Sequence, residues 1–178
     1  GVLDVAGGRG ALSHALHVSH GVPVTVVDPT PVRLQSSQRR HRDRLRAAVR
    51  KGRGGPGVEA EWRRSSAWVE WAQASAAGLD PGGGDGFRQE RREFWGDARR
   101  DLELVSSHAA VVGMHPDEAT GGLVEAALET GTPFAVVPCC VFPSLFPRRT
   151  LEDGTAVRHY DDLVEWLKRK HPDIHEGF

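Results

Sequence analysis

Short apolar runs alternate with longer amphipathic stretches along the whole chain. The runs have the length of buried strands, and we expect strands at Val2–Val5, Val22–Val27, Ala109–Met114 and Phe134–Phe142, with a short further one at Glu93–Trp95. Helical spacing of apolar residues predicts helices at Ala11–Ser19, from Pro31 to about Val49, at Glu59–Ala77, Glu118–Thr130 and Asp161–Lys170. Glycines follow several of these stretches, as helix C-caps often do.

This alternation of strands and helices predicts an α/β protein. Parallel strands need crossover connections, and the helices that supply them cover both faces of the sheet. We therefore expect a Rossmann-like three-layer α/β/α sandwich with a mainly parallel sheet. The 178 residues suffice for one domain, with an inserted loop and helix region at about residues 52–92. Trp62, Trp68 and Trp71 recur at helical spacing there, and core packing is favoured over stacking on nucleic-acid bases.

The composition is that of an ordinary globular domain and does not indicate a binding partner. The hydrophobic fraction is 39%, the charged fraction 26% and the formal net charge −1, as in an ordinary globular domain. No apolar run reaches the length of a membrane span, so no membrane partner is expected. The only two cysteines are adjacent, which excludes a disulfide framework and favours a reducing, intracellular compartment. The chain starts inside a strand without Met, so we expect a fragment truncated at both ends.

The first strand runs into a glycine turn that opens a helix. The turn reads Asp4, Val5, Ala6, Gly7, Gly8, Arg9, Gly10. Glycines let a backbone approach a ligand closely, and Asp28 ends the second strand, where a carboxylate can accept hydrogen bonds from both hydroxyls of a ribose. The Gly-x-Gly-x-x-Gly spacing of a dinucleotide site is absent, which disfavours a nicotinamide dehydrogenase. An acid before the turn suits a cationic cofactor better than a pyrophosphate.

The pattern Asp-x-Ala-Gly-Gly-x-Gly resembles the turn of class I S-adenosylmethionine-dependent methyltransferases. The resemblance implies S-adenosylmethionine as the cofactor and gives its site residues: Asp4, Ala6, Gly7, Gly8 and Gly10 for the amino acid end, Asp28 for the ribose and Asp97 near the adenine. The alternatives are a tight strand-to-helix turn without a ligand and, for Asp97, a solvated loop residue.

A second group of residues follows the later strands. His115 and Asp117 follow one strand and Pro138-Cys139-Cys140 stands in the next run, and ligands of doubly wound sheets bind beyond the carboxyl ends of strands. With the glycine turn, this ordered set resembles a group that includes tRNA acceptor-stem 2′-O-methyltransferases and the glutathione-S-transferase C-terminal-domain-containing protein. His115 and Asp117 are then the candidate catalytic residues. Where members of the group often have His-x-Cys-Gly, this chain has His115-Pro116-Asp117-Glu118.

No metal is expected. Adjacent cysteines poorly satisfy tetrahedral zinc and no Cys-x-x-Cys partner exists, so a structural or substrate-cleft role is favoured for Cys139 and Cys140. His14, His17 and His20 are spaced three apart, and we expect them to be ordinary surface residues.

The sequence predicts an S-adenosylmethionine-dependent methyltransferase whose acceptor stays open among RNA, protein and small molecules. Arg39, Arg42, Arg46 and Arg50 recur on one helix face, where a solvated surface is favoured over phosphate contact. The alternative function is a non-catalytic binding or assembly module that has kept the fold.

Overall fold

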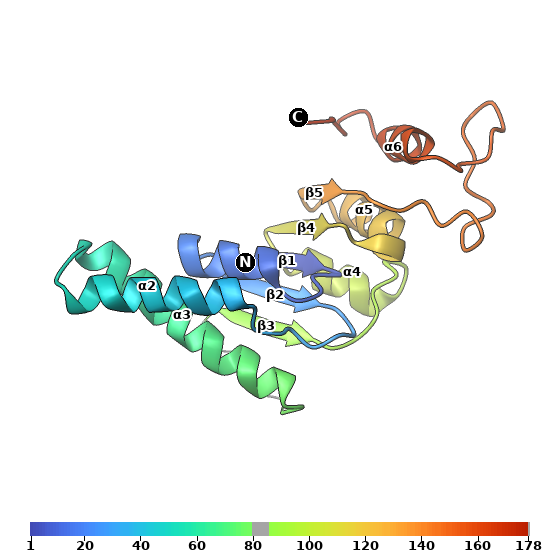
Figure 1. The fold of residues 1–178 in the computed structure, drawn as a ribbon. Helices are drawn as coiled ribbons and strands as arrows, with labels where there is room; N and C mark the ends of the chain where they lie inside the picture. Colours follow the sequence, from blue (N-terminus) through green and yellow to red (C-terminus); the bar gives the residue numbers. More distant parts are fainter. Residues whose placement is uncertain (80–85, 178) are drawn as a thin grey trace. The chain divides into compact units, whose positions relative to one another are not determined.

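The structure, a computed structural model, describes residues 1–79 and 86–177. Its elements run in the order β1 (Val2–Val5), α1 (Ala11–His14), η1 (Ala15–Ser19), β2 (Val24–Val27), α2 (Ser36–Arg50), α3 (Gly55–Ala76), β3 (Phe87–Glu90), α4 (Arg99–Ser106), β4 (Ala110–Met114), η2 (Asp117–Ala119), α5 (Thr120–Thr130), β5 (Phe134–Val137) and α6 (Tyr160–Lys168) (Figure 1). They form two compact units, Gly1–Glu93 and Phe94–Phe178. Each unit is described by itself.

The first unit is built on three parallel strands in the order β3-β2-β1. The apolar side of β2 packs with η1, α3 and β3 into one core, whose buried members are Val18, Val24, Val26, Val32, Trp68, Trp71, Ala72 and Phe87. Helices α2 and α3 form a hairpin beside these strands (Figure 1). The expected core role of Trp68 and Trp71 is confirmed, since both side chains are buried.

The second unit pairs β4 and β5 in parallel, and α5 connects them. Helix α5 packs against both strands and against α4. Its buried face carries Leu123, Val124 and Ala127, while α6 buries Leu163 and Leu167. In both units parallel strands alternate with helices that flank them, which confirms the predicted Rossmann-like α/β class. Among the described residues no helix is both long and apolar enough to cross a membrane.

Three expectations about the elements are wrong. The third strand is Phe87–Glu90, and Glu93–Trp95 is irregular. Strand β5 ends at Val137, so the chain is irregular from Pro138 to Phe142. Helix α4, at Arg99–Ser106, was not expected at all. The polar strand β3 and the short helix α4 lack the apolar runs on which the sequence reading depends.

The helix after the glycine turn is as predicted in extent but not in form. Its second half, Ala15–Ser19, is wound as a π-helix, a rare form that is frequent at functional sites. His14 and His17 on this helix are buried, so their assignment as surface residues is wrong; His20 is exposed, as expected. The rings of His14 and Trp68 lie edge to face with centroids 5.5 Å apart, and those of His17 and Phe87 with centroids 4.8 Å apart.

Candidate functional site

The glycine turn of the first unit is folded around two carboxylates. Asp4 lies on β1 with 1% of its surface exposed, and its Oδ2 accepts a hydrogen bond from the Ser13 hydroxyl at 2.5 Å. A Cβ on Gly7 would come within 2.8 Å of the same oxygen, so the carboxylate lies directly under the turn and only glycine leaves it room. The sequence thus places Asp4, Gly7 and the first turn of the helix in one closely packed group.

Asp4 has an unusual electrostatic state. Its Oδ1 is buried and has no hydrogen-bond partner in the described part of the chain. Burial raises the pKa of Asp4 from 3.8 to about 6, which the Ser13 hydrogen bond partly opposes. At neutral pH the group is therefore mostly ionised, at an energetic cost. A cation placed close to the turn would offset that cost.

Asp28 holds the turn to the end of β2. Its Oδ2 accepts a hydrogen bond from the Gly8 backbone N–H at 2.9 Å, and its Oδ1 accepts one from the Thr30 N–H at 2.7 Å. Asp28 is largely buried, with 8% of its surface exposed, and of the roughly four acceptor positions of a carboxylate up to two remain. Asp28 can thus cap the turn after β2 and still bind hydroxyl groups.

The backbone of the turn is left-handed at three of its predicted site residues. Ala6, Gly8 and Gly10 have φ of 53°, 53° and 73°. A Cβ on Gly8 would enter open space, whereas one on Gly10 would lie 3.0 Å from Val32 and 3.2 Å from Trp68. Gly8 therefore faces the side from which a ligand can approach, and Gly10 faces the core. The predicted residues Asp4, Ala6, Gly7, Gly8, Gly10 and Asp28 are all brought together in this unit.

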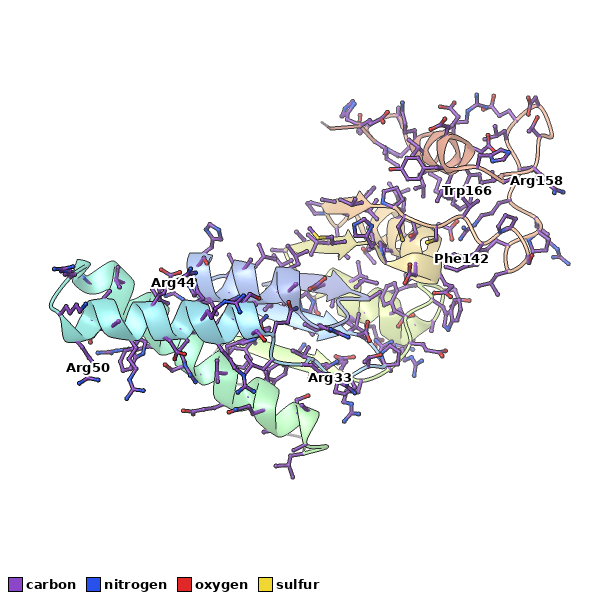
Figure 2. The ribbon with its side chains drawn as sticks, viewed as in Figure 1. Arg33, Arg44, Arg50, Phe142, Arg158 and Trp166 are labelled. Carbon is purple, nitrogen blue, oxygen red and sulfur yellow. The ribbon has the colours of Figure 1, made fainter. Side chains whose placement is uncertain are left out.

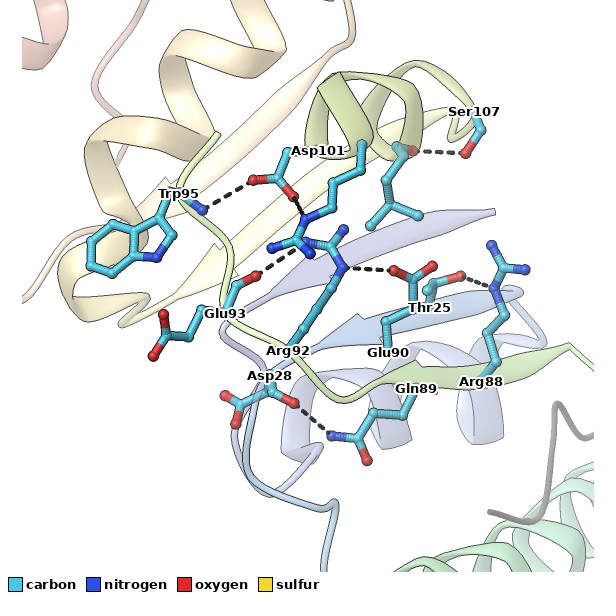
Figure 3. Close-up of polar contacts among 12 residues, drawn as sticks. Thr25, Asp28, Arg88, Gln89, Glu90, Arg92, Glu93, Trp95, Asp101 and Ser107 are labelled. Carbon is cyan, nitrogen blue, oxygen red and sulfur yellow. Dashed lines mark hydrogen bonds and ion pairs between the residues drawn. The ribbon is translucent and has the colours of Figure 1, made fainter. Parts of the chain in front are cut away.

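Sequence reasoning missed Gln89 on β3. Its Nε2 donates to the backbone oxygens of Asp28 at 3.2 Å and Thr30 at 2.7 Å, and its Oε1 accepts from the Val32 N–H at 3.1 Å. Figure 3 shows the bond from Gln89 to the Asp28 backbone, beside the bond from Arg88 to Thr25. A polar side chain on an edge strand gives no sequence signal for this role. Gln89 fixes the loop that carries Asp28.

Asp97 belongs to the second unit, where it is exposed. The segment before it is held by buried Asp101, whose Oδ2 accepts from the backbone N–H groups of Trp95 and Gly96 at 3.1 and 3.0 Å; Figure 3 shows the first of these bonds. Asp97 lines a hollow of about 530 Å³ together with Trp95 and Arg149. The guanidinium of Arg149 lies 3.5 Å from the centre of the Phe146 ring, which also lines this hollow. A contact of Asp97 with adenine stays a prediction.

The residues after β4 and β5 meet in the second unit. The His115 N–H donates to the Val137 oxygen at 3.0 Å, and the Cys139 thiol donates to Asp117 Oδ1 at 3.1 Å. His115 and Asp117 are exposed and have left-handed backbones, with φ of 57° and 47°. Such strain in residues other than glycine is concentrated at functional sites.

The Cys139 thiol is a donor rather than a nucleophile in this arrangement. Burial raises its pKa to about 12, and hydrogen bonds to Asp117 and Cys140 contribute to that rise. The thiol therefore keeps its proton at neutral pH. Asp117 has an acceptor oxygen at the surface, where it can orient a polar group of a substrate.

The four arginines of the predicted face lie on α2. Arg39, Arg46 and Arg50 are exposed, whereas Arg42 is partly buried and pairs with Asp43 at 2.8 Å. Figure 2 shows Arg44 and Arg50 on the same helix. A solvated helix surface accounts for these positions.

Comparisons of the chain with protein-family models, with curated proteins and with solved structures found no match.

Proposed function

We propose that this protein binds S-adenosylmethionine and transfers its methyl group to an acceptor. The observation that carries the proposal is the buried, partly unpaired carboxylate of Asp4 directly beneath a glycine turn with an open outer side. S-adenosylmethionine carries a sulfonium and an ammonium group, and a negative charge at low dielectric attracts such a cation strongly. A dinucleotide phosphate would be repelled there.

The cofactor contacts follow from the same residues. Gly8 and its neighbours in the turn bind the amino acid end, because no side chain blocks their approach. The Asp28 carboxylate accepts hydrogen bonds from the ribose hydroxyls through its remaining acceptor positions. Asp97, in the second unit, is the residue that the resemblance assigns to the adenine.

The transfer itself is an in-line displacement. S-adenosylmethionine, when bound, would supply an electrophilic methyl group to a lone pair of the acceptor, and its sulfur would leave with the electron pair of the carbon–sulfur bond. The acceptor's proton passes to His115 or Asp117. The protein contributes mainly by positioning donor and acceptor and by excluding water. RNA is the first acceptor class to test, followed by protein and small molecules.

The sharpest test is a thermodynamic cycle on Asp28. The affinities of the wild type and of Asp28→Ala are measured by calorimetry for S-adenosylhomocysteine and for its 2′-deoxyribose analogue. We expect the wild type to bind the deoxy analogue about tenfold or more weakly, since a hydrogen bond to a charged group contributes about 1.5–3 kcal/mol. Asp28→Ala should bind both ligands equally weakly.

The cycle separates ribose binding from the structural role of Asp28. If Asp28 only holds the turn, the deoxy analogue loses as much affinity in the variant as in the wild type. Methyl transfer from labelled cofactor to RNA, protein and metabolite pools then tests catalysis. An intact protein that binds neither cofactor nor product would support the non-catalytic module instead.

A further inference from the structure

Three potential metal ligands meet beyond the ends of β4 and β5. A carboxylate oxygen of Asp117 and the sulfurs of Cys139 and Cys140 all lie within 4.8 Å of one another. Asp117 and Cys139 already share a hydrogen bond of 3.1 Å, although they are separated by 22 positions in the sequence. The fold, rather than local spacing, assembles this group.

The distances suit a tetrahedral ion. With zinc–sulfur bonds of about 2.3 Å and zinc–oxygen bonds of about 2.1 Å, neighbouring ligand atoms are separated by roughly 3.5–3.8 Å. The sulfur and oxygen of the existing hydrogen bond need to move apart by only a few tenths of an ångström. Cys140 is exposed and can rotate to complete the group.

The backbone around Asp117 is held by hydrogen bonds. The Thr120 hydroxyl donates to the backbone oxygen of Asp117 at 2.8 Å, and the Ala119 N–H donates to the backbone oxygen of Pro116 at 2.9 Å. In a regular strand adjacent side chains point to opposite faces. The chain after Val137 is irregular, and this allows both thiols to approach the same carboxylate.

We propose that Asp117, Cys139 and Cys140 bind a thiophilic divalent cation such as Zn²⁺, with a fourth position open to water or to another ligand. Two thiolates and one carboxylate form a borderline-soft donor set, which suits zinc better than magnesium or calcium. Three protein ligands with one open position are typical of catalytic zinc sites, whereas structural zinc sites have four. The cation would replace the proton that Cys139 now donates to Asp117.

This proposal reverses the expectation from sequence that no metal binds. Adjacent cysteines alone do make a poor zinc site, and the position of Asp117 beyond the neighbouring strand did not by itself indicate a shared ligand. The proposal is independent of cofactor binding, although an Asp117 carboxylate that binds the cation leaves the acceptor's proton to His115. Its test contains no cofactor, and the Asp28 cycle contains no metal, so either can fail without the other.

The test is metal binding by the intact chain, reduced and freed of metal with a chelator. Zn²⁺ affinity is measured by competition with a chromophoric chelator, and Co²⁺ replaces zinc to report on geometry. We expect one equivalent to bind, with thiolate-to-cobalt charge-transfer absorption and the intense visible bands of tetrahedral cobalt. Cys139→Ser, Cys140→Ser and Asp117→Asn should each lower zinc affinity at least about tenfold, since even changes behind metal ligands cost about 10- to 100-fold.

Asp173→Asn is the matched control, because Asp173 is an exposed aspartate of the same unit outside the cluster. It should bind zinc like the wild type, and melting temperatures should show that every variant folds. The proposal is overturned if the wild type binds zinc no more tightly than the Cys139→Ser/Cys140→Ser double variant. Unchanged affinity in Asp117→Asn would equally overturn the three-ligand site.

Discussion

At the scale of single residues, two buried titratable groups in the first unit act on stability in opposite directions. Asp4 has a raised pKa of about 6, so between pH 3.8 and 6 the folded state binds more protons than the unfolded one. Its contribution to stability therefore falls as pH rises through that range. Burial, with smaller contributions from His41 and His17, lowers the pKa of His14 from 6.5 to about 4, so its contribution rises with pH over nearly the same range.

Substitution of Asp4 or of His14 should change how the free energy of unfolding depends on pH. Asp4→Asn should gain stability relative to the wild type as pH rises from about 4 to 6, by up to about 3 kcal/mol. His14→Gln should lose stability relative to the wild type over pH 4–6.5. Urea unfolding at a series of pH values measures both differences.

Equal slopes in Asp4→Asn and the wild type would mean that the Asp4 pKa is not raised by burial. The argument for a cationic ligand would then lose its electrostatic basis. A positive result would show that β1 holds an ionised carboxylate at a cost to stability. Such a cost is common where a site is arranged for a ligand rather than for folding.

At the scale of elements, Gly8 and Gly10 of the turn between β1 and α1 differ in what surrounds them. Gly8 and Gly10 both have positive φ, and an alanine in that region costs about 1–2 kcal/mol. Only Gly10 also has neighbours within 4 Å, namely Val32 and Trp68. Gly10→Ala should therefore destabilise the protein by about 1 kcal/mol more than Gly8→Ala, as measured by urea unfolding.

Cofactor affinity should follow the opposite order. Gly8→Ala places a methyl group where the ligand approaches, so we expect at least a tenfold loss of S-adenosylhomocysteine affinity in calorimetry. Gly52→Ala is the control, because Gly52 has φ of 62°, open space around it and no place in the turn. Gly52→Ala should lower the free energy of unfolding about as much as Gly8→Ala does, and its affinity for S-adenosylhomocysteine should match the wild type. Equal affinities in the two variants would place the ligand elsewhere.

The elements also show what the sequence could predict. Strand β1, the glycine turn and the helix after it follow from an apolar run and from glycines at positions with positive φ or a close neighbour. Strand β3 could not be found, because it is an edge strand whose only buried residue is Phe87. His14 and His17 were misassigned because the helix that carries them packs on α3 as well as on the strands.

The candidate site was predictable to a similar degree. Asp4 and Asp28 were found because one lies within a recognisable strand and the other directly follows one, and the structure brings both to the glycine turn. Gln89 could not be found, since its role depends on the pairing of β2 with β3. The sequence placed Asp117 and Cys139 beyond the ends of successive strands, but the hydrogen bond between them depends on the pairing of β4 with β5. Contacts made across a sheet leave no local pattern in the chain.

At the scale of the whole molecule, the two compact units carry separate candidate ligand sites. The glycine turn and Asp28 lie in the unit Gly1–Glu93, and the Asp117 cluster lies in the unit Phe94–Phe178. Each ligand should therefore leave its own footprint in hydrogen exchange, whatever the arrangement of the units. A ligand at 100 times its Kd adds about 2.7 kcal/mol to the stability of the state that binds it. Amides that exchange through opening of the site are then slowed by up to about 100-fold.

We expect S-adenosylhomocysteine to protect residues 4–14 and 26–32, and Zn²⁺ to protect residues 114–120 and 137–141. Mass spectrometry of deuterated peptides measures both patterns on the intact chain. Helix α6, which belongs to neither site, is the internal reference, and its exchange should not change with either ligand at saturating concentration. A bound ligand slows the local openings of its own binding site. If S-adenosylhomocysteine slowed exchange only in the second unit, the assignment of its site to the glycine turn would be wrong. If Zn²⁺ slowed amide exchange only around His14 and His17, the metal would bind the buried imidazoles rather than Asp117.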